Sequence, residues 1–116
     1  MGAKNEKNSV LKTCLANAQN LANLVEYATD SIVSKTILDK STGTITLFAF
    51  DKGQKLSEHT APYDAVVNII EGKAKITINN KEHEVASGEI IIMPSDVPHS
   101  VAADDNFKML LIMIRS

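Results

Sequence analysis

The sequence has 116 residues, a length that fits one domain and lets folding bury roughly two-thirds of the surface that the unfolded chain exposes. Hydrophobic residues make up 44% and charged residues 22%, which is ordinary for a globular protein, and no apolar run approaches the ~20 residues of a transmembrane helix. The formal net charge is −2 and basic residues do not cluster, so the composition excludes an electrostatic surface for nucleic acid or anionic membranes.

The first residues predict a tail followed by a short helix, whose Asn and Thr content also allows one or two helical turns followed by extended chain. Residues 1–9 are polar, and residues 10–27 place apolar side chains at helical spacing. A start of this kind does not resemble a secretory signal. Cys14 is the single cysteine, which excludes an internal disulfide and a thiolate zinc cluster and is typical of a reducing compartment. We therefore assign residues 1–30 to a tail and short helix, and we expect a cytoplasmic protein.

From Ser31 onward, the sequence predicts short strands. β-branched residues dominate the runs, and Gly, Pro, Asp or Asn residues separate them. No helical segment could connect parallel strands, and Asn79 with Asn80 suits the positive φ of a tight hairpin turn. Residues 31–116 therefore predict an all-β domain of about nine or ten strands, built as an antiparallel sandwich or closed barrel. The clearest strand segments lie at residues 31–38, 44–50, 65–70, 73–80, 81–85, 89–94, 99–103 and 107–114.

Two of these segments are apolar on both faces. Residues 65–70 and 107–114 lack the alternation of a strand with one wet face, so both of their faces should contact protein. One face fills the interior of the domain. The N-terminal segment or a second copy of the chain could cover the other, and an exposed apolar sheet would drive association. We therefore predict a homodimer.

Two glycine-framed segments contain the histidines of greatest interest. The first runs from Gly53 to Gly72 and contains His59, and the second runs from Gly88 to His99. Each segment has the pattern of a strand, a turn and a strand, and glycine permits the sharp change of direction at these turns. Both histidines fall where a β-barrel would direct a side chain into its cavity.

The first segment resembles the first motif of the cupin superfamily. That motif has a glycine, five residues, His, one residue, His, three or four residues, Glu, six residues and a glycine. Gly53, His59 and Gly72 are in register with it. Ala61 stands at the position of the second histidine, and Ala65 stands at the position of the glutamate.

The second segment is similar to the second cupin motif. Gly88, Pro94 and His99 match its glycine, proline and histidine, whereas Asp96 replaces its middle glycine and suits a turn. The resemblance covers about residue 38 to the C-terminus. It implies an antiparallel double-stranded β-helix, the jelly-roll or cupin barrel, in a small single-domain protein of the conserved-barrel type.

The resemblance also implies a degenerate metal site. In metal-binding cupins three histidines and the glutamate hold iron, manganese, nickel or zinc, and only His59 and His99 carry over as ligands here. Because zinc sites need three or four protein ligands, we expect at most a weakly bound divalent metal. Glu58 and Asp64 are neighbouring carboxylates, but strand alternation directs them away from the cavity unless a bulge intervenes.

A metal-free interpretation is that His59 and His99 face each other and exchange a proton near neutral pH, with Tyr63 at the mouth of the barrel. Some cupins that resemble sugar epimerases use a histidine as base and a tyrosine as acid in this way. His83 lies on a hairpin strand and is interpreted as a surface or sheet residue. The catalytic candidates are therefore His59, His99 and Tyr63.

The remaining interpretation is a binding module for a small molecule. Alanines at two ligand positions enlarge the cavity, and methionines on the core strands make it adaptable, which favours a small, partly apolar ligand. Three classes therefore remain: a ligand-binding or sensory module, a metal-dependent oxygenase or isomerase, and a metal-free acid–base enzyme. The predicted cavity residues are His59, Ala61, Tyr63, Ala65, Met93 and His99.

Overall fold

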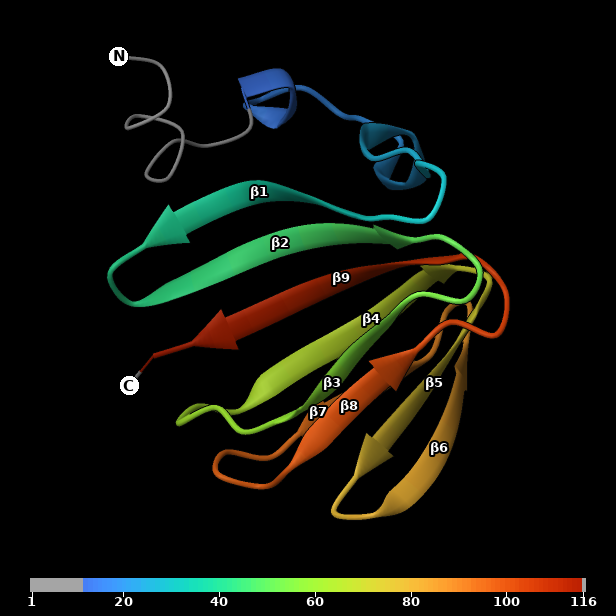
Figure 1. Ribbon diagram of the computed structural model, residues 1–116. Coiled ribbons are helices and arrows are strands. Elements are labelled where there is room, and N and C mark those ends of the chain that lie inside the picture. The colour runs from blue at the N-terminus through green and yellow to red at the C-terminus, as the bar shows by residue number, and fades with distance from the viewer. Residues whose placement is uncertain (1–11, 116) are drawn as a thin grey trace.

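The computed structural model describes residues 12–115, which form two antiparallel sheets that pack face to face (Figure 1). The elements are η1 (Lys12–Cys14), η2 (Leu21–Leu24), β1 (Ile32–Lys40), β2 (Gly43–Phe50), β3 (Lys55–His59), β4 (Ala65–Glu71), β5 (Lys73–Ile78), β6 (Lys81–Ala86), β7 (Ile90–Met93), β8 (His99–Ala102) and β9 (Phe107–Ile114). One sheet has the order β1-β2-β9-β4-β7, and the other has the order β3-β8-β5-β6. Every pair of neighbouring strands is antiparallel, so the all-β prediction is confirmed.

The hairpin predicted at Asn79 and Asn80 is present, and a second hairpin precedes it in the chain. Strand β1 pairs with β2, and β5 pairs with β6. Asn79 and Asn80 have φ of 50° and 67°, as the tight turn between β5 and β6 requires. Gly72, where the chain leaves one sheet for the other, has φ of 78°, and a Cβ atom there would lie 2.6 Å from the carbonyl oxygen of Asn106. Glycine is therefore required at this crossing.

The short helical segment predicted within residues 10–27 is present as isolated turns and not as one continuous helix. The chain forms only two short 3₁₀ turns, and Ala16 interrupts it with φ of 54°. The side chain of Asn20 accepts a hydrogen bond from the Ala22 amide, an arrangement that competes with a continuous helix. Among residues 12–115, no helix is long and apolar enough to cross a membrane. The tail predicted for residues 1–9 lies outside the described residues.

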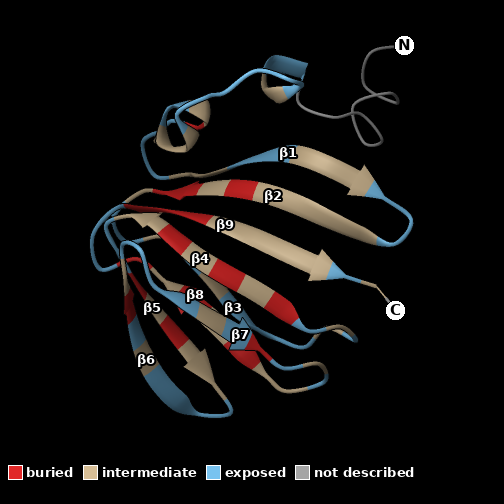
Figure 2. Ribbon diagram, turned by 180° about the vertical axis from the view of Figure 1, so that it is seen from behind, coloured by how far each residue is buried: buried red, intermediate tan, exposed pale blue. Residues whose placement is uncertain are grey.

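Large side chains fill one end of the space between the sheets. Phe50 and Phe107 are cross-strand neighbours, and their rings stack with centroids 4.6 Å apart. Ile69 and Ile76 are also fully buried there. Burying each such side chain stabilises the fold by about 1.5–3 kcal/mol. The buried positions lie on strands of both sheets (Figure 2). These side chains belong to one continuous core cluster that also contains residues of the cavity beside the histidines.

The N-terminal segment covers part of the outer face of the five-stranded sheet. Val25 is fully buried against Leu47 and Ala49 of β2, and Leu21 and Leu24 pack on the same cluster. This contact explains part of the apolar outer face of residues 107–114, because Leu110 packs on the cluster that the N-terminal segment covers.

Lys108 attaches this segment to the sheet. Its side chain is 9% exposed; the Nζ atom donates a 2.6 Å hydrogen bond to the Ala22 carbonyl and lies 3.9 Å from Oε2 of Glu71. The Tyr27 hydroxyl donates a 2.5 Å hydrogen bond to the same Glu71 oxygen, and Lys108 Nζ lies 5.0 Å from the Tyr27 ring centroid. Burial and the Glu71 carboxylate raise the pKa of Tyr27 well above its usual range, so Tyr27 remains a donor.

We expect Lys108→Met to lower the free energy of unfolding by about 1–3 kcal/mol, because it leaves the Ala22 carbonyl without its charged donor. Urea denaturation measures the loss, and amide exchange should accelerate at residues 21–27. The control is Lys73→Met, which breaks an exposed 3.6 Å ion pair with Glu84 and should cost about 0–1 kcal/mol. Equal stability of the two variants would contradict the anchoring role.

Part of the outer face remains uncovered. Ile90, Ile92 and Ile114 are 64%, 55% and 63% exposed, unusual values for isoleucines that lie on one sheet face. Beside them is a groove of about 420 Å³. The groove is lined by Pro62, Tyr63, Asp64, Val66, Ile92, Ser95, Ile112 and Ile114. A continuous apolar surface of this kind is typical of a contact with another protein surface.

We expect a second copy of the chain to cover this surface, so wild-type protein should be dimeric by light scattering at micromolar concentration. Ile92→Asp combined with Ile114→Asp should produce monomers, because a charge on each isoleucine position must be desolvated in the contact. Leu15→Asp is the matched control, since Leu15 is 65% exposed but lies outside the sheet. A monomeric wild-type protein at this concentration refutes the prediction.

Candidate functional site

His59 and His99 meet because strands β3 and β8 pair with one irregularity. Leu56 lies opposite Val101 and His59 lies opposite His99, so β3 uses three residues where β8 uses two. The extra residue is a β-bulge, a feature that redirects side chains near sites. As a result Leu56 and His59 line the same cavity although strand alternation alone would place them on opposite faces.

The two imidazole rings are arranged edge to face, with centroids 4.4 Å apart and an interplanar angle of 69°. Nδ1 of His59 lies 2.9 Å from the Ser57 carbonyl oxygen, and Nδ1 of His99 lies 3.1 Å from the Val97 carbonyl oxygen. Since a carbonyl only accepts hydrogen bonds, each Nδ1 must carry the proton. In the neutral rings both Nε2 atoms are therefore unprotonated, and they face each other at 3.2 Å.

Burial favours the neutral form of His99. The ring is 4% exposed, and desolvation lowers its pKa from the ordinary value of 6.5; the Val97 carbonyl raises the pKa and the nearby His59 lowers it further. His59 lies on the exposed side of the pair. The pair therefore presents two hydrogen-bond acceptors to a common point, one from inside the barrel and one from its mouth.

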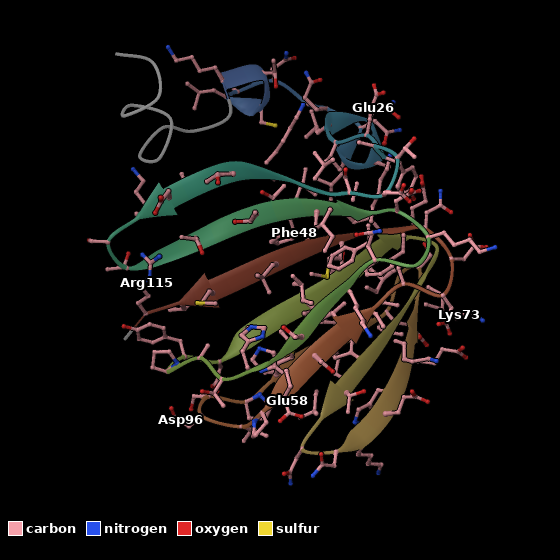
Figure 3. The ribbon with its side chains drawn as sticks, in the orientation of Figure 1. Glu26, Phe48, Glu58, Lys73, Asp96 and Arg115 are labelled. Carbon is pink, nitrogen blue, oxygen red and sulfur yellow. The ribbon has the colours of Figure 1, made fainter. Side chains whose placement is uncertain are left out.

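A cavity of about 70 Å³ adjoins the pair. The described residues that line it include no Asp, Glu, Lys or Arg, so the two histidines are its only ionisable side chains. Phe48 reaches it from β2 (Figure 3). The lining residues are Phe48, Leu56, His59, Ala61, Ala65, Met93, His99, Val101, Met109, Leu111 and Met113.

The structure brings together most of the residues that the sequence singles out. His59, Ala61, Ala65, Met93 and His99 all line this cavity. The predicted set lacks six further apolar lining residues, although their inward register is visible in the strand alternation once the strands are paired. These are Phe48, Leu56, Val101, Met109, Leu111 and Met113.

Tyr63 is not in the cavity and lies in the groove on the outer face, which corrects its predicted position at the barrel mouth. The reason is the loop before β4. Asp64 accepts a 2.8 Å hydrogen bond from the Ser95 amide, and the Asp96 amide donates a 2.7 Å hydrogen bond to the Ala61 carbonyl. These contacts hold the loop in a bend, so strand alternation does not extend back to Tyr63.

The described residues do not fit the four-ligand metal set of the resemblance. Within residues 12–115, no group of three or more His, Cys, Asp or Glu side chains is placed to hold an ion. The bulge in β3 turns His59 inward and leaves Glu58 exposed, and Asp64 is exposed at its loop. Glu58 and Asp96 lie at the end of the barrel opposite to Lys73 (Figure 3).

Asp96 and His83 lie where the sequence predicts them, in a turn and on a sheet strand. Asp96 has φ of 62° in the loop between β7 and β8, which is a turn conformation. His83 lies on β6 opposite Ile76 and is half-buried, away from the histidine pair. It is therefore a sheet residue, as the sequence predicts.

The model of the cupin domain family matches residues 46–115, so the chain belongs to the cupin family. It is 37% identical to a conserved protein of unknown function from Streptococcus pyogenes, with 87% of this chain and 89% of that chain covered and a TM-score of 0.83. A cupin 2 conserved barrel domain protein from Leptotrichia buccalis is 41% identical, with 84% of this chain covered and a TM-score of 0.81.

The chain spans 47% of the Leptotrichia buccalis protein, about half of its length. A cupin superfamily protein from Desulfitobacterium hafniense is 26% identical, with 84% of this chain and 90% of that chain covered and a TM-score of 0.81. Comparison with curated proteins gives no match. The relatives confirm the small conserved-barrel cupin that the motifs resemble, and they assign no reaction to it.

The lowered pKa of His99 predicts a pH dependence of stability. As the pH falls below about 6.5, the unfolded chain takes up a proton that folded His99 resists, so the free energy of unfolding should decrease until the pH passes below the lowered pKa. Urea denaturation between pH 7.5 and 5, with a chelator present, measures this.

His99→Gln should flatten the decrease in that window, and His83→Gln should leave it unchanged. If the free energy of unfolding instead rises as the pH falls, the expected direction is wrong. A proton shared between the two rings would then stabilise the fold by more than burial of its charge destabilises it.

Proposed function

We propose that this cupin binds a small, mainly apolar molecule that carries a hydrogen-bond donor, with Nε2 of His59 and Nε2 of His99 as the acceptors. The observation that carries the proposal is the pair of contacts from Nδ1 to backbone carbonyls, at 2.9 Å and 3.1 Å. They fix the tautomer of both rings and leave two lone pairs 3.2 Å apart without a donor between them. A ligand hydroxyl or amine supplies that donor.

The cavity limits the polarity and the size of the part of the ligand that it buries. Apart from the two histidines its lining is apolar, and a volume of about 70 Å³ is small beside the ~300–1,000 Å³ of common ligand pockets. The ligand therefore buries only a few atoms, and any larger part extends past the exposed His59. Charge recognition of an anion has no support, because Arg115 donates to the Lys40 carbonyl at the end of the chain.

The residues that line the cavity support ligand binding better than catalysis. A neutral Nε2 on His99 could act as a base, but among the described residues that line the cavity there is no tyrosine or carboxylic acid to act with it. The metal-dependent oxygenase or isomerase class requires protein ligands that Ala61 and Ala65 do not provide. The ligand-binding module needs no further residue.

We expect small alcohols and phenol to bind more tightly than their methyl ethers, by about three- to tenfold, because the ether lacks the donor for the two acceptors. Long-range ¹H–¹⁵N spectra of the histidine side chains report the binding. Nε2 of His59 and of His99 should resonate as unprotonated nitrogens and shift on addition of the alcohol, and His83 serves as the internal reference.

The matched variants are Ala65→Leu, which fills the cavity and should abolish binding, and Ala28→Leu, which adds the same side chain at an exposed position. Equal affinity for phenol and its methyl ether, or unchanged binding in Ala65→Leu, would refute the proposed ligand class.

A further inference from the structure

Two methionines flank the position where the family motif has its glutamate ligand. In strand register, Ala65 of β4 lies opposite Met93 of β7 on one side and opposite Met113 of β9 on the other. Directly opposite residues share a sheet face, with Cβ atoms about 4.5–5.5 Å apart. Alanine is short, so two thioether side chains border the space that a glutamate would occupy.

These thioethers and the imidazoles lie at one end of the barrel. His59 ends β3, Met93 ends β7 and His99 begins β8, and these strand ends lie together in the fold (Figure 1). All four side chains line the same cavity of about 70 Å³. The cavity lining therefore contains two imidazoles and three thioethers, and Met93 and Met113 are the two methionines that flank Ala65.

The spacing of the two nitrogens suits a metal ion. Nε2 of His59 and Nε2 of His99 are 3.2 Å apart, and both are unprotonated in the neutral rings. With metal–imidazole bonds of about 2.0–2.1 Å, this separation corresponds to an angle of roughly 100° at the ion. The distance therefore allows an ion to bind both nitrogens in adjacent coordination positions after a small rotation of the rings.

Charge and donor type select the ion. Imidazole and thioether are neutral ligands, and the described lining contains neither carboxylate nor thiolate to offset a divalent charge. The cost of burying an ion in a medium of low dielectric rises steeply with its charge, so a monovalent ion is favoured. Thioether sulfur is a soft ligand that selects Cu(I), whereas divalent ions such as manganese prefer oxygen ligands.

We propose that His59, His99, Met93 and Met113 form a binding site for monovalent copper. This site goes beyond the proposed ligand binding, and it uses donors that the family's four-ligand set does not include. Copper and the hydrogen-bond donor of an organic ligand compete for the same two nitrogens, so each excludes the other at that point.

The test uses full-length, tag-free Cys14→Ser protein, because the Cys14 thiol would bind Cu(I) by itself. Cu(I) is titrated without oxygen against the chromophoric chelator bicinchoninate. One ion should bind per chain, and Met93→Leu with Met113→Leu should weaken Cu(I) binding at least tenfold. Leucine conserves volume, so this variant should keep the fold. X-ray absorption should detect sulfur neighbours of copper in the parent protein and not in the double variant.

Met109→Leu is the matched control. Met109 also lines the cavity, but it pairs with Ile69, four residues along β9 from Met113 and roughly 13 Å away. Its loss should leave the Cu(I) affinity unchanged, and Zn(II) binding should be weaker than Cu(I) binding in every variant.

The proposal fails if Cu(I) does not compete with the chelator, if the double methionine variant binds Cu(I) as tightly as its parent, or if Zn(II) binds more tightly than Cu(I). The binding of alcohols is tested separately on the copper-free wild-type protein, so failure of the copper site and failure of the proposed ligand binding are distinguishable.

Discussion

Two backbone carbonyl groups determine what the barrel cavity offers to a ligand. The Ser57 and Val97 carbonyls each accept the Nδ1 proton of a histidine two residues further along the chain. Because the same contact occurs on both strands, the two rings adopt the same tautomer and turn unprotonated nitrogens toward each other. The chemical character of the site therefore depends on main-chain geometry as much as on the presence of two histidines.

Most of the fold follows from local sequence. Glycine and asparagine residues at positive φ mark the turns, and the alternation of β-branched residues gives the strand type, so both hairpins were predictable. The extent of the helical segment within residues 10–27 was not, because its apolar spacing fits short turns packed on a sheet as well as a continuous helix. Val25 is buried against β2 from an extended segment, and that contact is visible only when the sheet is in place.

The sequence predicts which histidines lie at the site, but it does not predict how their rings are oriented. The spacing of the motifs places His59 and His99 at the cavity, but whether their Nδ1 or Nε2 atoms meet depends on contacts with the backbone. The bulge that turns His59 inward needs the register of β8, and the outward position of Tyr63 results from loop hydrogen bonds. Likewise, Met93 and Met113 are far apart in the sequence and become neighbours of Ala65 only through strand order.

The first half of strand β9 is covered on both of its faces. Lys108 and Leu110 face the N-terminal segment, whereas Met109, Leu111 and Met113 face the cavity. A single layer of backbone therefore separates the cavity from residues 21–27. The cavity and the N-terminal segment lie against opposite faces of the same strand. The N-terminal segment is thus the outer support of the cavity wall, and a shortened chain that begins at the barrel would lack that support.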